Sequence, residues 1–424
     1  MRFLFIFLLI STRIFSQDTN EVYVLTFDGV VNPVAADMIH EAIQEADQAN
    51  SQCLIIEMDT PGGLMKSMQV IVKDILSSPI PIVVYIAPPG SRAGSAGVFI
   101  TYAANVAAMA PGTNIGAAHP VNFGSGVDTS ETMMEKITND AVAFITSIAE
   151  KRHRNVQWAE KAVRESASIP ANEALKLNVI NVVSPNLDSL LVWLNGKEYE
   201  VLNGKKILHT ENARVVQVEI SWRYKLLDVI SDPNIAYILL LIGMWGIFFE
   251  LLNPGSILPG VVGGISLILA FYALHTLPVN YAGVLLILLA LILFIAEVKI
   301  PSYGLLTVGG ILSLVLGSIM LFKGSMPFFQ VSWKVIAFAT IVTALFFIFV
   351  VGLGIRAQLR KPVTGNEGLI GEIGKAVEDF IKGSGRVSVH GEIWEATSAD
   401  KIKKGDVVTV LSVKNLKITV KKNN

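Results

Sequence analysis

Ser95 and Lys136 are the residues whose types and spacing could do chemistry. Ser95 lies in the run Gly94-Ser95-Ala96-Gly97, and Lys136 follows it by 41 residues (136 − 95). A serine hydroxyl attacks a carbonyl only when a base takes its proton, and lysine replaces the usual histidine in some hydrolases. If the fold brings the two side chains together, they could carry out acyl transfer.

The surroundings of Ser95 favour a nucleophile, although most short runs of small residues are turns. The run follows a predicted strand and Pro88-Pro89-Gly90, and it opens an apolar helical stretch over 98–104. We therefore expect Ser95 near a helix N-terminus, where free N–H groups and the helix dipole stabilise developing negative charge. Gly94 and Gly97 leave room for a peptide backbone beside the hydroxyl.

The pattern around Lys136 has two interpretations. Thr132-Met133-Met134-Glu135 resembles a capping box, which places Lys136 in the first turn of a helix. From this pattern alone, a surface lysine that pairs with Asp140 is the better explanation. As a base, a lysine must be neutral, which requires a pKa lowered from about 10.4 toward about 7 or 8. His119 is the histidine that could compete, and we interpret it as a loop residue.

Gly62-Gly63 follows a second predicted strand, over 54–58. This pair is either a bare strand-to-helix turn or an oxyanion hole, in which the N–H groups of Gly63 and Leu64 bind the tetrahedral intermediate. The residues beside both motifs predict a binding site for a hydrophobic substrate, formed by Gly62, Met65, Ala96, Met133 and Met134.

The elements that must position these residues alternate between strands and helices. Strands are predicted over 22–27, 54–58 and 82–86, and amphipathic helices over 34–49 and 65–76. This alternation predicts an α/β domain with a parallel sheet. Because functional loops lie beyond the carboxyl ends of such strands, both motifs are in the expected place.

Composition divides the 424-residue chain into soluble and membrane parts. It is 52% hydrophobic and 16% charged, against about 25% charged residues in soluble domains. Apolar residues concentrate in 234–355, which predicts spans at 234–250, 257–277, 281–297, 304–323 and 334–355. The first and third spans are marginal in length, so the prediction is four or five helices.

Other features restrict the class of protein. A net charge of −1 gives no support for nucleic-acid binding, and the single Cys53 lies in an apolar run that favours a buried thiol. We expect no metal and no cofactor.

Residues 1–16 have the pattern of a secretory signal peptide, with a basic start and an apolar run.

The membrane part contains a repeat that we interpret as a duplication. Glu250-x-x-x-Pro254 recurs as Glu297-x-x-x-Pro301, and each copy is followed by a Gly-Gly-Ile run. We expect the two glutamates to cap spans at the membrane interface. Five spans after a cleaved signal place the N-terminal domain outside the cytoplasm and the C-terminus inside, as the positive charges at 356–361 favour.

The last 60 or so residues predict a small β-barrel, because short alternating segments are separated by glycine turns. Lysines on this tail lack interleaved aromatic residues, which disfavours oligonucleotide binding. We interpret the tail as an interaction module.

The motifs together resemble the NfeD-type membrane-bound serine proteases. The matching runs are 59–63, 92–97, 110–120, 136–140, 154–160 and 173–175. The resemblance implies a signal peptide over 1–16, a ClpP/crotonase-like protease domain over 17–222, a membrane region over 223–360 and an OB-fold domain over 361–424. By this resemblance Ser95 is the nucleophile and Lys136 the general base of a Ser-Lys dyad. One departure is Gly94, where the family often has alanine.

The resemblance also implies a homo-oligomer in the inner cell membrane that cleaves hydrophobic segments of membrane-associated proteins such as stomatin-like partners. Two alternatives remain at this point. One is a non-catalytic scaffold that retains the protease fold, and the other is a crotonase-like acyl-CoA enzyme, which needs neither the dyad nor secretion. A transporter is disfavoured because Glu250 and Glu297 lie at span ends.

Overall fold

The computed structural model of the chain describes residues 20–121, 131–253, 255–277, 279–300, 302–322, 329–358 and 368–423. The predicted signal peptide, 1–16, lies outside the described residues. The chain divides into two compact units, Met1–Leu291 with Ser313–Ala337, and Ile292–Leu312 with Phe338–Asn424. This division passes through the predicted membrane region.

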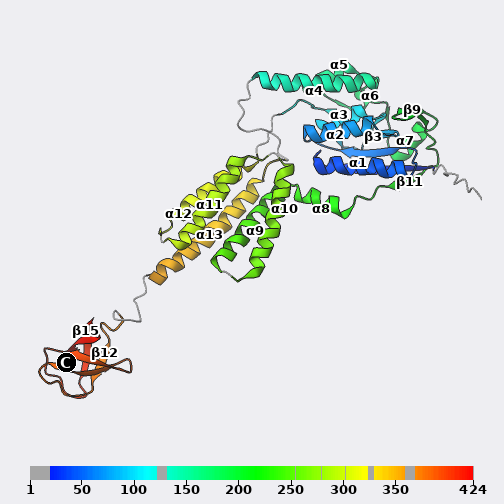
Figure 1. The fold of residues 1–424 in the computed structure, drawn as a ribbon. Helices are drawn as coiled ribbons and strands as arrows, with labels where there is room; N and C mark the ends of the chain where they lie inside the picture. The colour runs from blue at the N-terminus through cyan, green and yellow to red at the C-terminus, as the bar shows by residue number, and fades with distance from the viewer. Residues whose placement is uncertain are drawn as a thin grey trace, which may run out of the picture. The chain divides into compact units, whose positions relative to one another are not determined.

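A six-stranded sheet forms the centre of the N-terminal domain (Figure 1). Its strand order is β11-β1-β2-β3-β5-β8, and all neighbouring strands are parallel. Parallel neighbours require crossover connections, which helices supply. The strands are β1 (Glu21–Asp28), β2 (Leu54–Asp59), β3 (Ile82–Ile86), β5 (Val106–Met109), β8 (Val182–Val183) and β11 (Arg214–Gln217).

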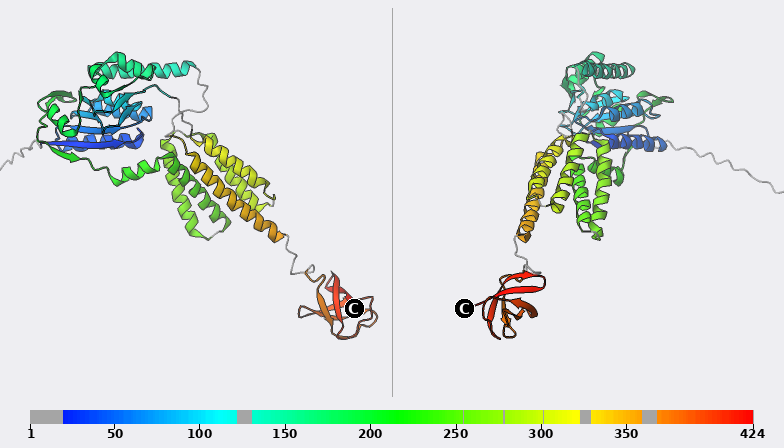
Figure 2. Two further views of the ribbon diagram at one scale, coloured as in Figure 1. Left: turned by 180° about the vertical axis from the view of Figure 1, so that it is seen from behind. Right: turned by 60° about the vertical axis from the view of Figure 1, so that its left-hand side comes forward.

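Helices cover both faces of this sheet because its strands are apolar on both sides. Leu25 and Phe27 face one core, whereas Val22 and Val24 face a second core that includes Leu190. Figure 2 shows α4 on the outside of the domain in both views. The helices are α1 (Pro33–Gln48), α2 (Met65–Leu76), α3 (Ala96–Ala103), α4 (Glu131–Lys151), α5 (Val156–Arg164), α6 (Ala171–Lys176) and α7 (Leu187–Leu194).

A second, three-stranded sheet carries the loop before Ser95. β4 (Arg92–Gly94) pairs in parallel with β6 (Asn114–Gly116), which pairs antiparallel with β7 (Ser168–Pro170). A separate hairpin joins β9 (Glu198–Val201) to β10 (Gly204–Ile207). The parallel sheet with a small sheet beyond its strand ends is the predicted ClpP/crotonase-like architecture.

The predicted membrane spans each contain one helix. These are α9 (Pro233–Leu252), α10 (Ile257–Thr276), α11 (Tyr281–Lys299), α12 (Leu305–Leu321) and α13 (Trp333–Gln358). Within the described residues, four helices are long and apolar enough to cross a membrane, and α12 is an apolar helix of 17 residues. The prediction of four or five spans is therefore confirmed, and the chain is a membrane protein.

Small residues let the helices of the first unit approach closely. A Cβ on Gly246 of α9 would lie 2.6 Å from the Cα of Gly263 in α10, so the two backbones are in contact. In the second unit, the rings of Phe294 and Phe347 stack with centroids 4.3 Å apart. A close glycine contact thus joins α9 to α10, and aromatic packing joins α11 to α13.

Glu297 caps α12, as predicted for a glutamate at a span end. Its carboxylate accepts hydrogen bonds from the Ser302 hydroxyl at 2.6 Å and from the N–H groups of Gly304 at 3.1 Å and Thr307 at 3.0 Å. In the first copy of the repeat, Glu250 lies 3.1 Å from the position of a Cβ on Gly260. Its Oε2 atom is buried and has no hydrogen-bond partner among the described residues.

The C-terminal domain is a closed five-stranded barrel, which confirms the OB-type prediction. Its order is β12-β13-β14-β16-β15, and its core includes Val387, Val408 and Ile418. The strands are β12 (Ile373–Ala376), β13 (Ser384–Val389), β14 (Glu392–Thr397), β15 (Val407–Lys414) and β16 (Lys417–Lys422).

Candidate active site

Two loops meet beyond the strands of the main sheet and form the site. The Thr60 N–H donates to the Arg92 carbonyl at 2.8 Å, and the Gly94 N–H donates to the Thr60 carbonyl at 2.9 Å. The Asp59 carboxylate accepts from the Arg92 N–H at 2.9 Å. The loop after β2 and the loop after β3 are therefore joined by their backbones. This junction brings Gly62 and Gly63 to Ser95.

Ser95 has the backbone geometry of a residue held for function. Its φ of +49° and ψ of −109° are unusual for a residue with a side chain, and such strain persists only where neighbours enforce it. The Ser95 N–H donates to the Gly116 carbonyl at 3.0 Å, which fixes the residue at the edge of the second sheet. Ser95 is half-buried and is the N-cap of α3, as the sequence predicted.

Gly62 and Gly63 fit only because they lack side chains. A Cβ on Gly62, whose φ is +116°, would lie 2.5 Å from the Ser95 Cβ and 3.1 Å from its Oγ. A Cβ on Gly63 would lie 2.1 Å from the carbonyl oxygen of Val31. Because non-bonded heavy atoms cannot approach this closely, the two glycines are required by the packing.

The amide groups of the predicted oxyanion hole differ in availability. The Leu64 N–H donates to the Val31 carbonyl at 2.7 Å, so it is occupied by the fold and cannot also bind a substrate oxygen. The Gly63 N–H has no acceptor among the described residues. Ala96 begins α3, and the first N–H groups of a helix lack intrahelical acceptors. Gly63 and Ala96 therefore offer free donors, and the prediction for Leu64 is corrected.

Arg154 anchors the far end of the helix that Ser95 begins. Its guanidinium donates to the carbonyls of Tyr102 at 3.4 Å and Ala104 at 3.0 Å, and to the Asn181 side chain at 2.9 Å. Burial lowers the pKa of Arg154 to about 10. Tyr102 raises this pKa and Arg152 lowers it, each by less than burial does. The C-terminus of α3 is thereby fixed, which holds its N-terminus against the glycine loop.

Lys136 lies in α4, exposed to solvent. α4 includes Glu131, so Thr132 is inside the helix and the predicted capping box does not form there. α4 packs on α3 through stacked rings of Phe99 and Phe144, with centroids 6.0 Å apart. In the described part of the chain, Lys136 makes no hydrogen bond and no ion pair, so it is bonded neither to Ser95 nor to Asp140.

The other predicted site residues fall into two groups. Gly62 and Ala96 are buried against Ser95, and Met65 is half-buried at the start of α2, directly after the glycine loop. Met133 and Met134 accompany Lys136 on α4, where Met133 is exposed. The structure thus places Gly62 and Ala96 beside Ser95, Met65 at the start of α2, and Met133 and Met134 with Lys136 on α4.

His119 makes no hydrogen bond with Ser95 among the described residues. Its Nδ1 lies 2.9 Å from the Val163 carbonyl, which makes that nitrogen the protonated donor. The interpretation of a loop histidine therefore agrees with this contact.

Sequence reasoning missed the residues that hold the glycine loop. The buried Thr60 hydroxyl lies 3.1 Å from the Gly62 N–H, from which it accepts, and Val31 binds both Gly62 and Leu64 through its backbone. A threonine two residues before Gly62 is a recognised turn signal, which could have identified Thr60. No local signal identifies Val31, because its partners are more than 30 residues away.

Three family models match the chain in the order of its parts. They are the NfeD1b N-terminal domain over residues 21–218, the NfeD integral membrane domain over 234–353 and the NfeD-like C-terminal, partner-binding domain over 366–422. The chain is also 38% identical over 415 residues to the membrane-bound protease PH1510 of Pyrococcus horikoshii, an alignment that covers 95% of this chain and 93% of that protein. The chain belongs to the NfeD family.

Other NfeD-type proteins are similar over most of their length. The membrane protein NfeD1b of Bacillus subtilis is 29% identical over 381 residues, which cover 88% of this chain and 81% of that protein. A solved structure of the 1510-N membrane-bound stomatin-specific protease, a serine-to-alanine mutant, is 36% identical, covers 48% of this chain and 99% of its own, and has a TM-score of 0.45.

A lysine-to-alanine mutant of the same 1510-N protease was solved in complex with a substrate peptide. It is 36% identical, covers 50% of this NfeD-family chain and 98% of its own, and has a TM-score of 0.47.

Proposed function

We propose that this NfeD-family protein is a membrane-bound serine endopeptidase in which Ser95 is the nucleophile and Lys136 the general base. The observation that carries the proposal is the strained Ser95, held at the N-terminus of α3 against a glycine loop. Membership of a family that includes the membrane-bound protease PH1510 supports the same reaction class.

The proposed reaction follows from the groups around Ser95. Lys136 takes the Ser95 proton while Oγ attacks the peptide carbonyl, and the N–H groups of Gly63 and Ala96 stabilise the oxyanion. The protonated lysine then gives its proton to the leaving amine as the C–N bond breaks. Water, deprotonated by Lys136, attacks the acyl-enzyme and releases the new carboxylate with free Ser95. Each proton taken is returned, so the enzyme is regenerated.

Lys136 has to lose solvent before it can act as a base, because burial favours the neutral form of an amine. Its exposed position on α4 therefore calls for coverage by substrate or by an inward shift of the first turns of that helix. Met133 and Met134 lie beside it, and these apolar side chains could cover the amine once a hydrophobic segment binds.

We infer that the substrate is a hydrophobic segment of a stomatin-like membrane protein. Apolar Met65 lies directly after the glycine loop, and the C-terminal domain matches a model described as partner-binding. The similar 1510-N membrane protease is specific for a stomatin homolog from Pyrococcus horikoshii.

In this proposal the protease domain lies outside the cytoplasm, the barrel lies inside, and the protein is a homo-oligomer.

The test uses full-length protein in detergent or lipid vesicles and a hydrophobic peptide substrate. Ser95→Ala and Lys136→Ala should each abolish cleavage, whereas Lys151→Ala, at the other end of α4, should retain it. Circular dichroism checks that the variants keep the fold. Unchanged cleavage by Lys136→Ala would remove Lys136 from the mechanism, and a wild-type protein without cleavage that still binds its partner would favour the scaffold alternative.

A further inference from the structure

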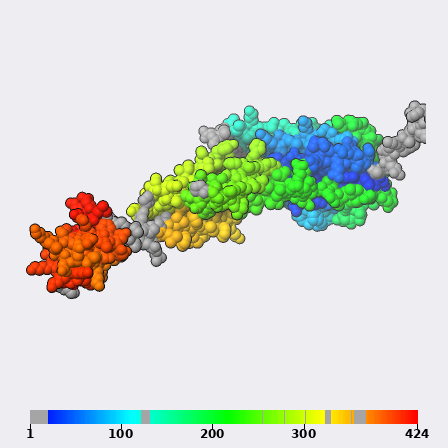
Figure 3. Space-filling model, turned by 60° about the horizontal axis from the view of Figure 1, so that its bottom comes forward, coloured from blue at the N-terminus to red at the C-terminus, as the bar shows by residue number. Residues whose placement is uncertain are grey.

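The helix α8 (Trp222–Ile230), which links the N-terminal domain to α9, has two different faces. Trp222, Leu226 and Val229 are exposed by 73%, 49% and 56%. Residues at positions i, i+4 and i+7 lie on one side of a helix, so these three form a single apolar stripe. Nothing in the described chain covers this stripe, and Figure 3 shows the green residues of this region at the molecular surface.

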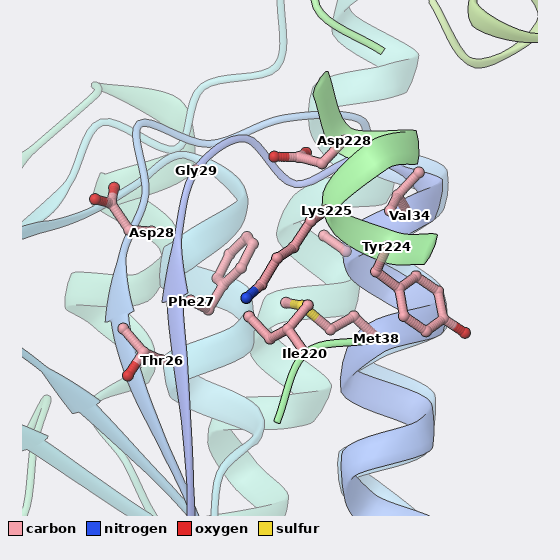
Figure 4. Close-up of a pocket in the computed structure, with 11 residues that line it drawn as sticks. Thr26, Phe27, Asp28, Gly29, Val34, Met38, Ile220, Tyr224, Lys225 and Asp228 are labelled. Atoms are coloured by element: carbon pink, nitrogen blue, oxygen red, sulfur yellow. The ribbon is translucent and has the colours of Figure 1, made fainter. Parts of the chain in front are cut away.

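The opposite face of α8 is fixed to the N-terminal domain. Tyr224, Lys225 and Asp228 line one side of a pocket, and Lys225 reaches toward Phe27 of β1 and Met38 of α1, which line the pocket as well (Figure 4). The Asn32 side chain lies 3.4 Å from the Asp228 carboxylate, to which it donates. These contacts set the rotation of α8, and therefore the direction in which the apolar stripe faces.

Tyr224 adds to this attachment. Its environment raises the pKa of the phenol to about 12, first through burial and then through the Glu41 carboxylate. The phenol therefore stays neutral at ordinary pH. The inner face of α8 thus carries the half-buried Tyr224 and the Asp228 carboxylate that accepts from Asn32, whereas the stripe on the outer face is apolar and exposed.

The chain continues from α8 directly into the membrane. Ser231 and Asp232 alone separate it from α9, and Asp232 caps α9 by accepting from the N–H of Asn234 at 2.8 Å. The 20 residues of α9 extend about 30 Å, which equals the thickness of the hydrocarbon core. Two residues span at most about 10 Å between helix ends, so α8 ends close to the membrane boundary.

We propose that the stripe of Trp222, Leu226 and Val229 docks on the lipid headgroup–acyl boundary of the bilayer that α9 enters. Tryptophan is enriched at this boundary, and a short helix with an apolar stripe binds in its plane. Arg223, exposed beside the stripe, suits anionic headgroups. Docking holds the β1–α1 edge of the domain at the membrane surface, including Asn32 and the adjacent Val31 that supports the glycine loop.

The experiment measures the depth of spin labels on the full-length protein in vesicles of phosphatidylcholine and phosphatidylglycerol. Leu226→Cys and Val229→Cys report the stripe, and Arg223→Cys reports another side of the same helix. Val192→Cys is the matched control, because Val192 is a 69% exposed apolar residue on α7. The native Cys53 is fully buried, so the unmodified chain serves as the labelling blank.

The quantity compared is the ratio of a label's collision rate with oxygen to its collision rate with a water-soluble nickel chelate. This ratio should be several-fold higher for labels at 226 and 229 than for labels at 192 and 223. Equal ratios at all four positions would overturn the proposal, because the stripe would then face water. Protection of 226 and 229 from both reagents would also overturn it, because a protein partner or a second copy would then cover the stripe. The measurement does not depend on proteolysis, so it stands apart from the proposed enzyme activity.

Discussion

Gly62 lies so close to Ser95 that a methyl group on the glycine would reach within 2.5 Å of the serine Cβ. The two residues come from different loops, and backbone hydrogen bonds between Thr60, Arg92 and Gly94 join those loops. The position of the Ser95 hydroxyl is therefore set by the glycine loop as much as by α3. An oxyanion donor on this loop has a fixed place relative to the nucleophile.

Gly62→Ala should lower the rate of cleavage by at least about a hundredfold, a loss of the size seen when an oxyanion donor is removed. The matched control is Gly90→Ala, because Gly90 also has a left-handed φ, +98° against +116°, but open space around its Cβ position. Gly90→Ala should lose about 1 to 2 kcal/mol of stability from backbone strain, and Gly62→Ala should lose more because its Cβ also meets Ser95. Equal activity in the two variants would show that the contact with Ser95 does not matter.

Arg154→Met should destabilise the N-terminal domain by about 3 to 5 kcal/mol, because the carbonyls at the end of α3 would lose their buried donors. Thermal unfolding of the full-length protein measures the change. Arg164→Met removes an exposed ion pair with Glu160 and should cost less than about 1 kcal/mol. Similar losses in the two variants would contradict the anchoring role of Arg154.

The Cys53 thiol should resist alkylation in the folded protein at pH 8. Burial, slightly opposed by Lys206, raises the pKa of Cys53 from 9.0 to about 12, so almost no thiolate is present. Between pH 9.0 and about 12, the folded state keeps a proton that the unfolded state loses. The contribution of this thiol to the free energy of unfolding therefore falls as the pH rises. Mass spectrometry after iodoacetamide treatment should find modification only in denatured protein, and rapid native modification would refute burial.

Local sequence patterns were sufficient for β1, β2 and β3 and for the membrane helices, but not for β5, β8 and β11, the other three strands of the central sheet. The apolar strand over 82–86 became β3 with the predicted bounds, and the five apolar segments each became one helix, because these patterns depend on short-range periodicity. The three-residue strands β4, β6 and β7 were not predicted, because such short segments carry no periodicity. β12 was also missed for this reason, since it has only four residues.

The candidate site was predictable in its residue types but not in its contacts. Ser95 at a helix N-terminus followed from the sequence, whereas its positive φ depends on the tertiary bond to Gly116. Leu64 was assigned as a donor because it follows two glycines, but its N–H pairs with Val31, a partner that only the fold reveals. The solvent exposure of Lys136 also follows from how α4 packs, and the helical pattern around it gave no measure of its distance from Ser95.

The dyad of Ser95 and Lys136 is the central claim, and acylation by a fluorophosphonate probe tests it most directly. Peptide mapping by mass spectrometry locates the modified residue without the need for a known substrate. We expect modification at Ser95 in the wild-type protein, none in Ser95→Ala, and strongly slowed modification in Lys136→Ala but not in Lys151→Ala. Modification at another residue, or an unchanged rate in Lys136→Ala, would contradict the dyad.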